Sequence, residues 1–250
     1  MRNDLLAAWH ATVRKFGPRC AIVQASDGGS VTFDELDRRS REWVERHARD
    51  PAAFAGRAVV FALPNGISWL EVFLGLMRAG AVAVPVESAE PVASRRELAR
   101  SLRAGFLWED GRLTPLASPR RFRGPGTCFI KLTSGSTGQP RPLVFTARQL
   151  LADARQVTRA MGITAADSNL ALIPFGHSYG MGNITLPLVA MGVRVVCGSG
   201  ALPRAVLADC AKWKPTVFPG VPVLWRALAE MGGAEAGSGD SLPGVRLCIS

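Results

Sequence analysis

Three features are missing from this 250-residue sequence: a long apolar run, a Cys-x-x-Cys pair and a lysine-rich patch. No stretch approaches the roughly 18 apolar residues that a membrane helix needs, and residues 1–16 lack the apolar segment of a signal peptide. The five cysteines are widely spaced, so we expect reduced thiols in a cytoplasmic protein. Because 48% of the residues are hydrophobic, the chain is too apolar to remain disordered. A globular protein with no membrane span is therefore expected.

The net charge of +10 comes almost entirely from arginine. A basic chain invites a nucleic-acid interpretation. However, the arginines are scattered among acidic residues, as in the run 38–46, and no aromatic residues interleave with them as a platform for single strands requires. We expect a solvated surface that attracts anionic ligands, and no nucleic-acid partner. A basic interaction module remains the alternative, and it predicts strongly salt-dependent binding.

Short apolar segments alternate with helical ones along most of the chain. Strands are expected at 21–24, 31–33, 58–63, 81–86, 127–132, 170–174, 193–197, 216–218 and 245–250. Helices are expected at 4–16, 33–48, 67–78, 94–104, 146–161, 181–191, 203–213 and 222–231. Capping boxes mark three of the helix starts: Thr32 with Glu35, Ser94 with Glu97, and Thr146 with Gln149.

This alternation predicts an α/β fold of mostly parallel sheets with helices on both faces, a three-layer αβα arrangement. Residues 113–126 are rich in proline and arginine and are expected to be a connector. We therefore divide the chain into two α/β parts. Residues 1–125 contain the N-terminal helix and hairpin, and residues 126–250 contain the loop described next.

The segment from Thr133 to Arg141 concentrates hydroxyl groups and glycines directly after an apolar strand. Glycines allow successive backbone N–H groups to converge on an anion, hydroxyls add short donors, and an arginine adds a full charge. We interpret this loop as a cradle for polyphosphate; a plain Ser/Gly linker is the alternative. The spacings of a Walker A loop and of a Rossmann Gly-x-Gly-x-x-Gly motif are both absent.

The loop resembles the phosphate loop T-S-G-[ST]-T-G-x-P-K-G of the AMP-forming adenylating enzymes, which include acyl-CoA synthetases and peptide-synthetase adenylation domains. Other segments are similar to family motifs in the same order along nearly the whole chain: V-T-F-D-E-L at 31–36, L-P-N at 63–65, R-A-G-A-V at 78–82, P-F-G-H-S-Y-G at 174–180 and F-P-G-V-P at 218–222. The resemblance implies the adenylating-enzyme fold, specifically the N-terminal part of its large domain.

The resemblance also implies a reaction. A carboxylic acid attacks the α-phosphate of ATP to give an acyl-adenylate, and coenzyme A then takes the acyl group. The implied ATP-binding residues are Thr133, Ser134, Gly135, Ser136, Thr137 and Gly138. Thr137 is the implied Mg²⁺ ligand, and Arg141 and His177 are the implied catalytic residues. ATP, Mg²⁺ and coenzyme A are the expected cofactors and co-substrates.

Two positions depart from the family pattern. Arg141-Pro142 replaces Lys-Gly, which keeps the charge but stiffens the end of the loop. Gly176 stands where the family usually has an aromatic residue, so we expect free space beside His177. His177 is expected to orient the carboxylate or to gate the acyl channel; a histidine satisfied by the backbone of a tight turn is the alternative.

The later motifs of the family do not occur in this sequence, which ends in an apolar strand. We interpret the chain as incomplete, with the second half expected in the full protein, and expect it alone to turn over no acid; a strand inside the sheet that ends the protein is the alternative. Apolar residues beside His177 favour a fatty or aryl acid. A non-catalytic nucleotide- or anion-binding domain is the alternative function.

Overall fold

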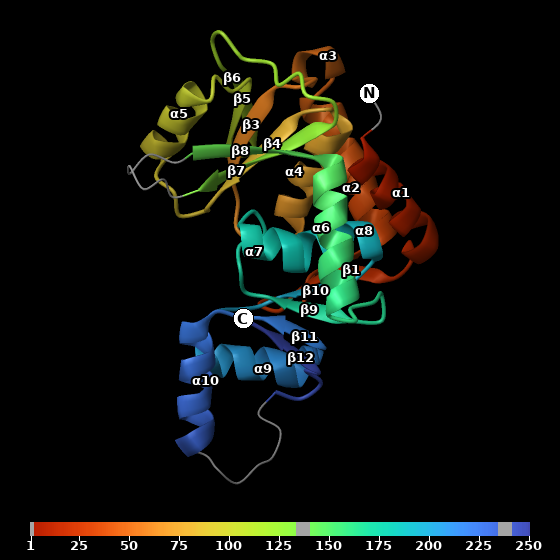
Figure 1. Ribbon diagram of the computed structural model, residues 1–250, viewed down its shortest axis with the longest axis vertical. Helices are drawn as coiled ribbons and strands as arrows, with labels where there is room; N and C mark the ends of the chain where they lie inside the picture. The colour runs from red at the N-terminus through yellow and green to blue at the C-terminus, as the bar shows by residue number, and fades with distance from the viewer. Residues whose placement is uncertain (1–2, 134–140, 235–241) are drawn as a thin grey trace.

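The computed structural model describes residues 3–133, 141–234 and 242–250, and their strands form two six-stranded sheets (Figure 1). Sheet I contains β3 (Ala58–Ala62), β4 (Val82–Val86), β5 (Phe106–Glu109), β6 (Arg112–Pro115), β7 (Thr127–Thr133) and β8 (Arg141–Thr146). Sheet II contains β1 (Cys20–Gln24), β2 (Ser30–Thr32), β9 (Ser168–Ala171), β10 (Arg194–Cys197), β11 (Val217–Pro219) and β12 (Leu247–Ile249).

Both sheets are mostly parallel, as the apolar strands predict. The strand order is β6-β5-β3-β4-β7-β8 in sheet I and β12-β11-β9-β10-β1-β2 in sheet II. The pairs β5–β6, β7–β8 and β1–β2 are antiparallel hairpins, and the other pairs are parallel. The hairpins therefore lie at both edges of sheet I and at the β2 edge of sheet II, while the strands in the middle of each sheet run in one direction.

Helices cover both faces of each sheet. They are α1 (Asp4–Phe16), α2 (Phe33–His47), α3 (Pro51–Phe54), α4 (Ile67–Arg78), α5 (Val92–Ser101), α6 (Ala147–Ala160), α7 (Ser178–Gly180), the π-helix η1 (Met181–Thr185), α8 (Leu186–Met191), α9 (Pro203–Trp213) and α10 (Pro222–Ala234). Helices α1, α2, α4, α6 and α8 share one core with both sheets. Helix α5 packs on the far face of sheet I, and α9 with α10 on the far face of sheet II (Figure 1).

Strand alternation explains why one helical layer serves two sheets. In β3, Val59 and Phe61 face the shared core, whereas Ala58 and Val60 face α5. Because successive side chains of a strand point to opposite faces, a strand that is apolar throughout must be covered on both sides. Helix α4, which is apolar nearly all round in the sequence, is correspondingly buried along most of its length in the shared core.

A buried charge cluster joins three of the central helices. The Asp37 carboxylate on α2 accepts a hydrogen bond of 2.7 Å from Trp9 Nε1 on α1 and forms an ion pair with Arg78 on α4. Arg41 pairs with the same carboxylate at 3.0 Å, and Ser40 accepts from Arg78. Burial lowers the pKa of Arg78, while Asp37 raises it. These contacts, which we call the Asp37 cluster, fix the helices relative to one another.

Two of the three predicted capping boxes are confirmed. Thr32 and Thr146 each accept from the third residue of the helix, and the side chains of Glu35 and Gln149 return the contact. The prediction at Ser94 is wrong, because α5 begins at Val92 after Pro91 and has no side-chain cap. A proline fixes the backbone before the first turn, and this replaces the expected cap.

The structure corrects the expected course of the chain on either side of β7. Residues 113–126 were expected to be a connector, yet Arg112–Pro115 is a strand that pairs with β5. The phosphate loop was expected to lead into a helix, but β8 follows it and pairs with β7 from Thr127↔Thr146 to Thr133↔Arg141. An outer strand can contain Pro142 because one of its edges needs no ladder hydrogen bond.

Each sheet contains strands from both sides of residue 125. The division of the chain into two parts, residues 1–125 and 126–250, stays a prediction. Among the residues that the structure describes, no helix has both the length and the apolarity required to cross a bilayer.

Candidate functional site

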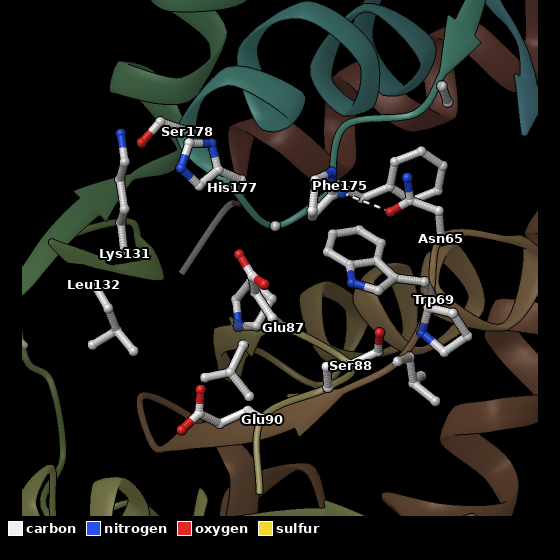
Figure 2. A pocket seen from close by; sticks show the side chains of 18 of the residues that line it. Asn65, Trp69, Glu87, Ser88, Glu90, Lys131, Leu132, Phe175, His177 and Ser178 are labelled. Carbon is white, nitrogen blue, oxygen red and sulfur yellow. Dashed lines mark hydrogen bonds between the residues drawn. The ribbon is translucent and has the colours of Figure 1, made fainter. Parts of the chain in front are cut away.

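A cavity of about 1040 Å³ lies where the two sheets direct the carboxyl ends of their strands toward each other (Figure 2). Residues that end or follow β3, β4 and β7 line it from sheet I, and those that end or follow β9 and β10 line it from sheet II. Open α/β sheets bind ligands outside the carboxyl ends of their strands. The principal lining residues are Leu63, Asn65, Trp69, Pro85, Glu87, Glu90, Glu97, Lys131, Thr133, Phe175, Gly176, His177, Ser178 and Gly198.

The structure brings Thr133 and His177 to this one cavity, although 44 positions separate them in the chain. Thr133 ends β7, and its hydroxyl donates to the carbonyl oxygen of Arg141 at 3.3 Å. Arg141 is exposed at the start of β8. The predicted phosphate and metal ligands Ser134, Gly135, Ser136, Thr137 and Gly138 lie outside the described residues.

His177 lies at the cavity and also takes part in a turn. Its Nδ1 accepts a hydrogen bond of 3.3 Å from the backbone N–H of Tyr179, so the ring caps the short helix α7. This contact uses one ring nitrogen. Within the described ranges no hydrogen bond engages Nε2, and the ring is exposed beside Ser178 (Figure 2). The backbone contact orients the imidazole, and the second nitrogen is available to a ligand.

The absence of a side chain at Gly176 does not itself leave free space. A Cβ atom there would lie 2.5 Å from Cβ of Pro85 and 3.6 Å from Cζ2 of Trp69. The backbone therefore packs directly against these two residues, and the space beside His177 is that of the cavity it lines. The ring of Phe175 meets Trp69 edge to face, with centroids 5.4 Å apart. Together these residues form the apolar end of the cavity.

Asn65 holds the segment that contains His177 against sheet I. Its Nδ2 donates to the carbonyl oxygen of Ile173 at 2.8 Å. Its Oδ1 accepts from the N–H of Phe175, also at 2.8 Å (Figure 2). One side chain thus satisfies two backbone groups of the β9–α7 segment. The L-P-N motif in the sequence pointed to Asn65, but only the structure shows that its side chain clamps the β9–α7 segment.

Side chains of both charge signs line the cavity. Glu87, Glu90 and Glu97 come from the β4–α5 side, and Lys131 comes from β7 beside Thr133. The sequence analysis missed Lys131, although a lysine in the apolar run 128–132 was a signal. The buried cysteines offer no nucleophile, because burial raises the pKa of the Cys128 and Cys197 thiols to about 12.

No cluster of three metal-binding side chains occurs in the described part of the chain. Mg²⁺ in nucleotide sites is commonly held by one or two protein groups together with phosphate oxygens, so it does not require a cage of carboxylates. The donors near the cavity, which are mainly hydroxyls and backbone groups, fit that kind of shared coordination. Thr137 remains the predicted protein ligand.

Residues 118–250 match a family model described as AMP-binding enzyme. The chain is 25% identical to feruloyl-CoA synthase from Amycolatopsis sp over 252 residues, covering 92% of this chain and 51% of that protein. It is also 25% identical to benzoate–CoA ligase from Thauera aromatica over 243 residues, covering 82% of this chain and 46% of that protein. The chain thus spans about half the length of these curated relatives.

Solved structures share the fold. ATP-bound MatB from Rhodopseudomonas palustris superimposes with a TM-score of 0.81 at 18% identity, over 100% of this chain and 55% of that one. The N-terminal domain of FACL13 from Mycobacterium tuberculosis gives a TM-score of 0.81 at 16% identity, over 99% of this chain and 69% of that one.

Proposed function

The chain belongs to the AMP-binding enzyme family, and on that premise we propose that it is part of an AMP-forming ligase that activates a carboxylic acid with ATP and transfers the acyl group to coenzyme A. The match covers the loop at 133–141 and the segment at 174–180, which carried the resemblance to adenylating enzymes. Curated relatives named as CoA ligases support the reaction class.

The proposed chemistry has two steps. A carboxylate oxygen attacks the α-phosphorus of ATP, the bond to the bridging oxygen breaks, and pyrophosphate leaves. The thiol of coenzyme A then attacks the acyl carbon, and AMP leaves. Negative charge develops on the phosphate oxygens in the first step, so donors aimed at those oxygens lower the barrier most.

The residues of this chain have distinct roles in the proposal. Thr133 to Gly138 donate hydrogen bonds to the β- and γ-phosphates, and Arg141 adds charge at the end of the loop. Thr137 would hold Mg²⁺, which would supply positive charge to offset the charge of the phosphates. His177, oriented by the N–H of Tyr179, holds the carboxylate through Nε2.

A single observation carries this proposal: Thr133 and His177, expected from different motifs, lie on one cavity at the carboxyl ends of both sheets. The apolar end formed by Trp69, Pro85 and Phe175 favours a fatty or aryl acid over a polar one. The names of the relatives, which include feruloyl and benzoate ligases and a putative fatty-acid ligase, point to the same classes.

The test is ATP binding by the 250-residue chain, measured by isothermal titration calorimetry with Mg²⁺. We expect inorganic tripolyphosphate to compete with ATP and adenosine not to compete, because the loop binds phosphate. Replacing Ser134, Ser136 and Thr137 with alanine should weaken ATP binding at least about tenfold, since three donors to charged oxygens are lost. The matched control replaces Ser26 and Thr114, exposed hydroxyls in other hairpins, and should leave binding unchanged.

Equal ATP affinity of the triple variant and the unaltered chain would contradict the proposal. The second candidate is a non-catalytic nucleotide- or anion-binding domain, which would keep the cavity and the phosphate loop without the reaction. Pyrophosphate release with ATP and a panel of acids tests the expectation that the 250-residue chain alone turns over nothing. An open reading frame past Ser250 that encodes the later family motifs would favour the ligase over the binding domain.

A further inference from the structure

Lys131 occupies an unusual place for a lysine. It lies near the carboxyl end of β7, between the buried Ile130 and the half-buried Leu132, in a run of residues that is otherwise apolar from Cys128 to Leu132. Because side chains alternate along a strand, Lys131 is on the same face as Thr133, two residues later. Its side chain lines the cavity, and Figure 2 shows it rising from the strand beside Ser178 and His177.

The ammonium group of Lys131 is held in place without a carboxylate. Its Nζ lies 5.7 Å from the centroid of the Phe145 ring on β8, and the side chain is half-buried. None of the ion pairs formed among the described residues includes Lys131. Lys131 therefore presents to the cavity a positive charge that no carboxylate of the described residues neutralises, and such a charge attracts an anionic ligand.

The acidic residues of the lining make Lys131 the more favourable contact for an anion. Glu87, Glu90 and Glu97 line the cavity from the β4–α5 side, and in the described part of the chain none of them forms an ion pair. Strand β4 pairs with β7, so these carboxylates lie on the same sheet as Lys131. Because carboxylates repel an anion and an ammonium group attracts one, we expect the anionic end of a ligand to approach Lys131 and not the glutamates.

We propose that Lys131 is a binding residue for the oxyanion of the ligand in this cavity, either a phosphate group of the nucleotide or the carboxylate of the acid. The inference rests on the proposed function, and it adds a residue that the family resemblance did not assign. A phosphate is the favoured source, because Lys131 shares a face with Thr133 at the start of the phosphate loop. Lysine binds phosphate as a compact point charge.

The experiment compares three variants of the 250-residue chain. Lys131→Met keeps the length of the side chain and removes the charge, and Lys131→Arg keeps the charge. Lys212→Met is the matched control, because Nζ of Lys212 also lies over an aromatic ring, that of Trp213 at 4.8 Å, but on the exposed surface of α9. The probes are inorganic tripolyphosphate, ATP with Mg²⁺, and benzoate or hexanoate alone, each titrated at low and moderate salt.

We expect Lys131→Met to weaken binding of tripolyphosphate about tenfold at low salt and to reduce the salt dependence of binding. Lys131→Arg should restore most of the affinity, and Lys212→Met should bind as the unaltered chain does. Loss of benzoate or hexanoate binding with tripolyphosphate unchanged would identify the carboxylate as the oxyanion, which also supports the proposal.

Two results would overturn the inference. If the unaltered chain binds ATP and Lys131→Met binds every probe equally well, Lys131 has no such role and the proposed function stands. If the unaltered chain binds neither ATP nor tripolyphosphate, both proposals fail together. Thermal unfolding of each variant separates a loss of binding from a loss of folding, and rescue by arginine is a second safeguard.

Discussion

Two groups of charged side chains in this protein differ in how they are satisfied. In the Asp37 cluster the carboxylate accepts from Trp9 and pairs with Arg41 and Arg78 among packed helices. Around the cavity, Lys131 and Glu87 face open space and, as far as the described residues extend, form no ion pair. The first group therefore joins packed helices, whereas the second leaves its charges free to interact with a ligand, as we propose for Lys131.

The largest expected effect is the loss of the Asp37 carboxylate. Asp37→Ala leaves the mostly buried Arg78 guanidinium without its counter-charge, and we expect the free energy of unfolding to fall by about 3 kcal/mol. Urea unfolding followed by circular dichroism measures this. Glu45→Ala, at an exposed position of the same helix, is the control and should cost less than about 0.5 kcal/mol. If Asp37→Ala lowered the free energy of unfolding by less than Glu45→Ala does, the Asp37 cluster would not stabilise the fold as we describe.

The next effect is at the clamp between the sheets. Asn65→Ala leaves the N–H of Phe175 and the carbonyl of Ile173 without partners, and we expect a loss of about 2 kcal/mol in the free energy of unfolding. ATP affinity should fall as well, because the clamp positions the segment that contains His177. Asn65→Asp keeps the acceptor for the N–H of Phe175 but loses the donor to Ile173. Its free energy of unfolding should therefore lie between those of Asn65→Ala and the unaltered chain. Identical stability and affinity of all three proteins would contradict the role of the clamp.

A smaller effect is expected at Gly176, where the backbone packs closely against a side chain. Gly176→Ala places a methyl group 2.5 Å from Cβ of Pro85, and we expect overpacking to cost about 1.5 kcal/mol. Gly200 also lines the cavity, but its added methyl would lie 3.7 Å from Ala205, an ordinary contact. Gly200→Ala should therefore be nearly neutral in the same unfolding assay. Equal costs at the two positions would show that Gly176 is not tightly packed.

The smallest effect depends on pH. Hydrogen bonds from Arg246 lower the pKa of Asp167 to about 2, against about 3.9 in an unfolded chain. Because the folded pKa is the lower one, the contribution is fully present above about pH 4 and is lost as the pH falls toward 2. We expect Arg246→Met to remove this part of the pH dependence of urea unfolding between pH 5 and pH 3. An unchanged slope would mean that the ion pair does not stabilise the fold.

The parts of the fold that local chemistry dictates could be predicted from the sequence. Helix α4 is apolar nearly all round, and it lies in the core between the two sheets. The hydroxyls of Thr32 and Thr146 start helices where their spacing to Glu35 and Gln149 predicts. In each case the pattern that decides the outcome lies within a few turns of one segment of the sequence.

The remaining features depend on weak or long-range signals. The hairpin β5–β6 turns at Asp110 and Gly111, both at positive φ, and this Asp-Gly pair was a readable hairpin signal. Strand β8 gave none, because it contains Pro142 and is mostly exposed. The contact of Gly176 with Pro85 joins residues 91 positions apart, and only the folded structure shows that the space is filled.

The most direct test of the whole account is a crystal structure of this chain with a non-hydrolysable ATP analogue and Mg²⁺. The account predicts phosphate oxygens in the cavity between Thr133 and His177, with Nζ of Lys131 within hydrogen-bond distance of one of them. It predicts no phosphate oxygen in contact with Glu87, Glu90 or Glu97. Phosphates bound outside the cavity, or against Glu87 and Glu90, would contradict it.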